Sequence, residues 1–163
     1  MKFTTVGMNH AEYLKHCDRM RRSLELAQQA GEAGEVPVGA IVVQDDTIIA
    51  EAENRRERDL DPTAHAEVLA LRQAGQVLQS WHLNDCTLYV TLEPCPMCAG
   101  AIVLARLGLL VYGADDPKAG AVRTVLNLPD SPASNHRLGV LGGILEAPCR
   151  AQLQEWFRQR RNR

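Results

Sequence analysis

Three residues of the sequence have the types and the spacing of metal ligands: His65, Cys95 and Cys98. One imidazole and two thiolates suit a zinc ion, which proteins usually bind in a tetrahedral arrangement of four ligands. Because the chain supplies three ligands, the fourth position is open to water, and zinc sites of this kind are catalytic rather than structural. The sequence therefore predicts one catalytic zinc ion per chain, held by these three side chains.

The Cys-x-x-Cys spacing of Cys95 and Cys98 also occurs in redox dithiols and in structural zinc ribbons. Three features argue against both alternatives: the His-x-Glu triplet that ends at Glu67, Pro94 directly before the first cysteine, and the lack of a second Cys-x-x-Cys pair. His-x-Glu combined with Pro-Cys-x-x-Cys is the signature of zinc-dependent nucleobase deaminases. The reaction class that we expect is hydrolytic deamination.

Glu67 is the candidate proton carrier in that reaction. On an ideal helix His65 and Glu67 would point about 200° apart, so both cannot approach a metal that lies against the helix side. Side chains of a first helical turn lean towards the N-terminus, and we therefore expect the zinc between two helix N-termini. Zinc lowers the pKa of a bound water to about 7, and Glu67 can carry that proton to the base and then to the leaving amine. An acid in the first turn also complements the helix dipole, which is a purely structural alternative.

Hydrophobic periodicity and turn signals predict the elements that position these residues. The predicted helices cover residues 17–30, 64–73 and 96–105, and a last helix has an apolar face formed by Cys149, Leu153, Trp156 and Phe157. The predicted strands cover residues 39–43 and 48–50, which form a hairpin, and residues 87–92, 109–112 and 138–145. Residues 115–135 are expected to be irregular, apart from a short helical piece at 122–126. The crossover helix makes the third and fourth strands parallel. This order predicts a three-layer α/β fold, with a central mixed sheet of about five strands and helices on both faces.

Size and composition limit the classes of protein. A chain of 163 residues suits one domain. Five cysteines and an N-terminus without an apolar segment argue against secretion, and no apolar run approaches the ~20 residues that span a bilayer, so we expect a cytoplasmic protein. The net charge of −2 does not indicate nucleic-acid binding, although four of the last six residues are arginines. Taken alone, such a tail is more typical of a solvated helix end.

Beyond the metal signature, the chain resembles the bacterial tRNA-specific adenosine deaminases from about Ser23 to Arg161. The resemblance rests on residues 35–40, 54–55, 61–67, 88–95 and 97–101, and also on residues 113–118, 135–137, 143–145 and 157–158, which generic cytidine or guanine deaminases do not share. It divides the chain into an N-terminal extension of unknown role at residues 1–22 and a zinc-dependent deaminase domain at residues 23–163.

The resemblance implies a cytidine-deaminase-like fold, a homodimer, and conversion of adenosine to inosine at the wobble position of a tRNA anticodon, most often that of an arginine tRNA. It implies that Asn54 contacts the purine and that Val36, Pro37, Ala66 and Leu92 line its pocket. The residues that it assigns to flanking nucleotides and phosphates are Asp115, Lys118, Asn135, His136, Arg137, Phe157 and Arg158. Trp156 stands where a second Phe is common in the family, and this departure affects how the last helix packs over the anticodon loop.

Two other functions stay open from the sequence. The closer one is the same chemistry on a free base or nucleotide, such as guanine or a cytidine derivative. The basic C-terminus and Asn135-His136-Arg137 argue against it, because a small substrate has no use for them. The other is a noncatalytic, zinc-stabilised RNA-binding module, against which Glu67 argues because nothing structural requires a glutamate there.

Overall fold

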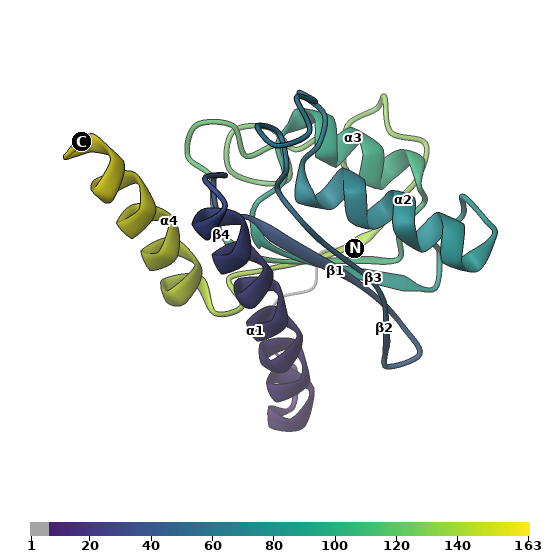
Figure 1. Cartoon of the computed structure of the whole chain (residues 1–163). Helices are drawn as coiled ribbons and strands as arrows, with labels where there is room; N and C mark the ends of the chain where they lie inside the picture. The colour runs from purple at the N-terminus through teal and green to yellow at the C-terminus, as the bar shows by residue number, and fades with distance from the viewer. Residues whose placement is uncertain (1–6) are drawn as a thin grey trace.

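A computed structural model describes residues 7–163, and in this range five strands form one mixed sheet (Figure 1). The strands are β1 (Gly39–Gln44), β2 (Thr47–Glu53), β3 (Cys86–Leu92), β4 (Leu109–Ala114) and β5 (Gly139–Gly142), in the order β2-β1-β3-β4-β5. β1 pairs antiparallel with β2 and β3, whereas β4 pairs parallel with β3 on one side and with β5 on the other. The predicted fold class, hairpin and parallel pairing of the third and fourth strands are confirmed.

Helices cover both faces of this sheet (Figure 1). α2 (Ala66–Leu78) and α3 (Pro96–Leu104) lie on one face, and α1 (His10–Glu32) and α4 (Glu146–Arg161) lie on the other. The alternation of side chains along β1 explains this arrangement: Ala40 and Val42 pack in the core beneath α2 and α3, whereas Ile41 and Val43 pack in the core beneath α1. Within the described residues, no helix is long and apolar enough to cross a membrane.

α1 begins earlier than the periodicity predicts, at His10 rather than at Cys17. Asn9 and Glu12 form a capping box, in which the Asn9 side chain accepts a hydrogen bond from the Glu12 backbone and the Glu12 side chain accepts one from the Asn9 backbone. The predicted division between residues 22 and 23 therefore falls inside a continuous helix, and the buried residues Cys17 and Met20 precede it. The first six residues of the predicted extension lie outside the described part of the chain.

The end of α2 and the packed face of α4 differ from the prediction. α2 continues through Gly75 to Leu78, and its C-cap is the left-handed residue Gln79. Along α4, Cys149 is buried, but Phe157 is 45% exposed and does not belong to the packed face. Trp156 instead contacts α1, where its indole Nε1 donates to the Gly31 carbonyl at 3.2 Å.

The segment between β4 and β5 contains turns, and the short helix predicted at residues 122–126 is wrong. The backbone N–H groups of Arg123 and Thr124 donate to the Glu93 carboxylate, each at 2.9 Å, rather than to carbonyls of a preceding helical turn. β5 is also shorter than predicted, because Gly143 and Leu145 have positive φ angles of 88° and 52° and end the extended backbone.

Candidate metal-dependent active site

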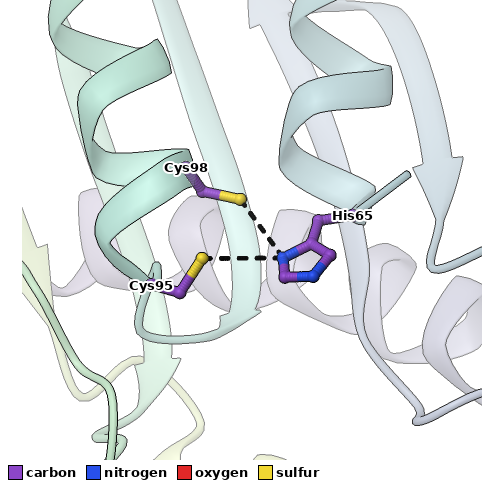
Figure 2. A group of neighbouring side chains, drawn as sticks. All are labelled: His65, Cys95 and Cys98. Carbon is purple, nitrogen blue, oxygen red and sulfur yellow. Dashed lines mark hydrogen bonds between the residues drawn. The ribbon is translucent and has the colours of Figure 1, made fainter. Parts of the chain in front are cut away.

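The three predicted metal ligands meet between the first turns of two helices (Figure 2). His65 is the N-cap residue of α2, Cys95 is the N-cap residue of α3, and Cys98 lies in the first turn of α3. The His65 Nδ1 atom lies 3.6 Å from the Cys95 Sγ atom and 3.5 Å from the Cys98 Sγ atom. Among the residues that the structure describes, these three side chains form the group whose ligand atoms lie close enough together to hold a metal ion.

These distances fit a zinc ion. Zinc–sulfur bonds of about 2.3 Å and zinc–nitrogen bonds of about 2.0–2.1 Å, arranged at the tetrahedral angle, place the nitrogen and sulfur ligands about 3.5–3.6 Å apart. The two Nδ1–Sγ distances agree with this value. The donor set of one imidazole and two thiols is also the soft, mixed set that zinc prefers.

The local sequence explains why both helices begin at a ligand. Before α2, the Asp61 carboxylate accepts hydrogen bonds from the backbone N–H and the hydroxyl of Thr63, which forms a tight turn. Before α3, Pro96 occupies the first helical turn, where its missing N–H group costs nothing. His65 and Cys95 have extended backbone conformations, and neither side chain caps its helix, so both are available as ligands.

Hydrogen bonding within the cluster favours a thiolate. The hydrogen bond from Cys98 lowers the pKa of the Cys95 thiol to about 4. The same hydrogen bond, with burial as a second cause, raises the pKa of Cys98. A hydrogen bond with Cys95 also raises the pKa of His65. Cys98 would bind a metal ion as a thiolate, so metal binding at this site would be coupled to the release of its proton.

Glu67 lies beside this cluster and is 4% exposed. Burial raises the pKa of its carboxyl group to about 6. Glu67 faces a cavity of about 210 Å³, which is lined by Val36, Val38, Asn54, Arg56, His65, Ala66, Glu67, Leu92, Glu93, Cys95, Asp116 and Ala119. The arrangement combines three metal ligands, one buried acid and a small cavity, which is what hydrolysis of a C–N bond on a flat base requires.

Four of the five predicted pocket residues line this cavity, and the fifth, Pro37, is buried but does not reach it. Asn54 is itself buried: its Nδ2 atom donates to the Val36 carbonyl at 3.1 Å, and its Oδ1 atom accepts from the Arg56 backbone at 3.2 Å. One N–H group and one lone pair of the Asn54 amide remain for a ligand.

The residues predicted to hold flanking nucleotides lie outside the cavity, and several have partners within the protein. His136 Nε2 donates to the Leu107 carbonyl at 2.7 Å, and Arg137 donates to the carbonyls of Pro129 and Ser134. Asp115 lies 3.8 Å from Arg123, and Arg158 pairs with Glu155. Lys118, Asn135 and Phe157 are exposed.

Sequence reasoning missed four charged residues of the site. Arg56 and Asp116 line the cavity, and Glu35 and Glu93 are buried carboxylates that bind the loops around it. Glu93 had a signal, because an acid directly before Pro94-Cys95 lies next to a metal ligand. Arg56 belongs to no motif, and Glu35 had only its place in residues 35–40 of the family resemblance, which assigned it no role.

Comparison with known proteins identifies the family of the chain. The sequence profile of the MafB19-like deaminases matches residues 14–161. A tRNA-specific adenosine deaminase of Bacillus subtilis is 46% identical over 144 residues, which are 88% of this chain and 89% of the relative. The chain belongs to the tRNA-specific adenosine deaminase family. The predicted family resemblance is therefore confirmed.

Solved structures agree with this family assignment. One comes from a study of A-to-I editing by tRNA:A34 deaminases at the wobble position; it is 42% identical with a TM-score of 0.81, over 83% of this chain and 98% of the other. A guanine deaminase from Nitrosomonas europaea has the same fold at 28% identity and a TM-score of 0.73, over 86% of this chain and 83% of that one. The deaminase fold is thus shared by enzymes with macromolecular and with small substrates.

Proposed function

We propose that the protein hydrolyses the amino group of adenosine to give inosine at the wobble position of a tRNA anticodon, with an arginine tRNA as the expected substrate. The observation that carries this proposal is the group of His65, Cys95 and Cys98 beside buried Glu67, in a chain 46% identical to a tRNA-specific adenosine deaminase. We also propose a cytoplasmic location, which rests on the similarity to bacterial tRNA enzymes.

The three ligands would hold one zinc ion per chain, and the fit of the Nδ1–Sγ distances supports this choice of metal. When bound, zinc lowers the pKa of a water molecule to about 7 and so makes a nucleophile available at neutral pH. Cys95 and Cys98 would bind as thiolates, because neutral thiols are poor zinc ligands.

Glu67 would move the protons of the reaction. It first takes one proton from the attacking water and delivers it to the ring nitrogen beside the carbon under attack. It then takes the second proton, from the hydroxyl group now bonded to that carbon, and delivers it to the amine, which leaves as ammonia. Burial supports this role, because a carboxyl group with a pKa of about 6 exchanges protons more readily near neutral pH than an ordinary glutamate.

The cavity would hold a single base. Its volume of about 210 Å³ is below the ~300 Å³ at which sites for drug-sized ligands begin, so the neighbouring nucleotides must stay outside. Asn54 would hydrogen-bond the purine, and Val36, Ala66 and Leu92 would pack against it. The residues outside the cavity, among them Lys118, Asn135, Phe157 and Arg158, would contact the rest of the anticodon loop.

We also propose a homodimer, which rests on the family resemblance. An apolar groove of about 740 Å³ runs between α2 and α3, and this exposed apolar surface is the one that we propose for the contact with a second copy. Trp81 and Leu104 line it, with 63% and 73% of their surfaces exposed. Sedimentation equilibrium should give a dimer for the wild type and a monomer for Leu104→Glu. A monomeric wild type at micromolar concentration would remove the dimer and leave the catalytic proposal standing.

The second candidate function is deamination of a free purine, favoured by the structural similarity to a guanine deaminase. One assay separates the two: the purified protein is incubated with an arginine tRNA carrying an ACG anticodon, with free adenosine and with guanine, and the products are measured. Inosine formed in the tRNA alone is the expected result. Turnover of guanine without editing of the tRNA would replace our proposal with the small-substrate function.

A further inference from the structure

One cation lines the cavity and is not part of the predicted metal centre: Arg56. It belongs to the loop between β2 and α2, in which three arginines follow within five residues of Asn54. The other two are Arg55 and Arg58, and their guanidinium groups have partners within the protein.

Arg55 and Arg58 are both engaged within the protein. The Arg55 guanidinium makes three hydrogen bonds of 3.0–3.1 Å to the Asp59 carboxylate. Arg58 donates to the Asn54 carbonyl at 2.9 Å and forms ion pairs with the buried Glu35 and with Glu53. The charges of these two arginines are therefore balanced by acids of their own protein.

The guanidinium of Arg56, in contrast, has no hydrogen bond or ion pair with any residue from 7 to 163. Only its backbone is held, by the Asn54 side chain at its N–H group and by the Asp61 N–H group at its carbonyl. The backbone is thus fixed beside the cavity while the charged end of the side chain stays exposed. A guanidinium without a partner at the entrance of a binding cavity is available for an anion.

The other charged residues around the cavity determine where an anion can lie. Glu67 and Glu93 are buried, and Glu93 is occupied by hydrogen bonds from the loop after β4. Asp116 borders the cavity from that same loop, so this part of the cavity wall carries negative charge, whereas the two cations of the loop, Lys118 and Arg123, lie outside the cavity. The favourable side is the one that carries Arg56.

We propose that Arg56 binds an RNA phosphate adjoining the nucleotide whose base enters the cavity. The inference rests on the proposed function: when one base fills a cavity of this size, its ribose and the adjoining phosphodiesters lie at the entrance. The planar guanidinium can donate two parallel hydrogen bonds to one phosphate, which orients the nucleotide as well as attracting it. Arg56 is thereby a substrate-positioning residue outside the motifs that the sequence analysis identified.

Kinetics and salt dependence with an anticodon stem-loop RNA test this inference, with Arg55→Gln as the matched control in the same loop. Arg56→Gln should raise KM about tenfold, more than it lowers kcat, and should reduce the slope of log Kd against log salt by about 0.7. Arg56→Lys should restore the slope but not all of the affinity, since it returns the charge without the paired donors. Metal content and melting temperature should match the wild type in each variant.

Three other outcomes would contradict either the inference on Arg56 or the function on which it rests. If Arg56→Gln leaves the salt slope unchanged, or Arg55→Gln reduces it equally, Arg56 does not bind the phosphate. If Arg56→Gln changes turnover of adenosine 5′-monophosphate as much as that of the RNA, the anion is that of a free nucleotide. If the wild-type enzyme does not edit the stem-loop at all, the proposed function fails, and the role of Arg56 in RNA binding fails with it.

Discussion

The metal centre and the two loops beside it are held in place by different kinds of contact. His65, Cys95 and Cys98 stand at the first turns of α2 and α3, whose other residues pack in the core on one face of the sheet. The loops, residues 54–64 and 115–124, contain turns but no helix or strand. Regular structure thus positions the metal ligands, whereas the walls of the cavity need another source of order.

One buried carboxylate for each loop contributes to that order. Glu35, which is 1% exposed, accepts hydrogen bonds from the backbone N–H groups of Glu57 and Arg58. Glu93, also 1% exposed, accepts four hydrogen bonds, from the N–H groups of Asp116, Arg123 and Thr124 and from the Thr124 hydroxyl. In each case a charged side chain satisfies backbone donors that a helix or a sheet would otherwise satisfy.

The comparison predicts that mutations can affect the reacting groups and the substrate loops separately. The loop around Glu93 is so close that a Cβ atom at Gly120 would lie 1.6 Å from the carboxylate. Glu93 is two residues from Cys95 in sequence, yet its hydrogen bonds all go to the loop and none to the metal ligands. Changes at the metal ligands should therefore remove chemistry, and changes at Glu93 should disturb binding.

The largest effect is expected at the metal ligands. Cys98→Ala removes one of three ligands and should lose most of the metal, together with the folding free energy that metal binding supplies. Elemental analysis and thermal unfolding check this. Cys17→Ala is the control, because Cys17 is an equally buried cysteine in the core beneath α1. Equal metal loss in the two variants would contradict the ligand assignment.

Glu67→Gln should keep the metal but lower kcat by about 10²–10⁴-fold, the range that general acid–base catalysis contributes. The amide preserves the size of the buried side chain and cannot carry the proton. Binding of the stem-loop RNA, measured separately, should stay close to that of the wild type. A variant with kcat within a few-fold of the wild type would exclude Glu67 as the proton carrier.

Glu93→Gln tests whether the loops are held independently of the metal. The amide places an N–H donor where only acceptors fit, and the loss of one hydrogen bond to a buried charge should lower the melting temperature by roughly 5 °C. We expect full metal content and a raised KM. Glu35→Gln should destabilise the protein similarly through the other loop. Metal loss in Glu93→Gln as large as in Cys98→Ala would mean that the two regions are not separable.

The sequence predicted the metal centre better than the loops, and the reason is physical. His65, Glu67, Cys95 and Cys98 follow helix-start signals that act over a few residues, so their relative placement depends on local structure. The bonds of Glu35 and Glu93 join residues 22 to 31 positions apart, and no periodic pattern records such contacts. The same limit explains the wrong helix at residues 122–126, where a distant carboxylate takes the backbone donors that a helix would use.

The smallest effect is expected at the C-terminal arginines, which lie furthest from regular packing. Residues 157–163 are exposed, and α4 projects away from the sheet towards its C-terminal end (Figure 1). Arg158 pairs with Glu155, and Arg160 lies 3.6 Å from the centre of the Trp156 ring, so neither is as available to a phosphate as Arg56.

Changing Arg158, Arg160 and Arg161 to Gln should still raise KM for tRNA and flatten the salt dependence of binding, because long-range attraction needs charge rather than a fixed geometry. The melting temperature should barely change, since exposed ion pairs contribute little to stability. Salt titrations of tRNA affinity measure the effect. An unchanged slope would identify the tail as a solvated helix end and leave recognition to Arg56 and the two loops.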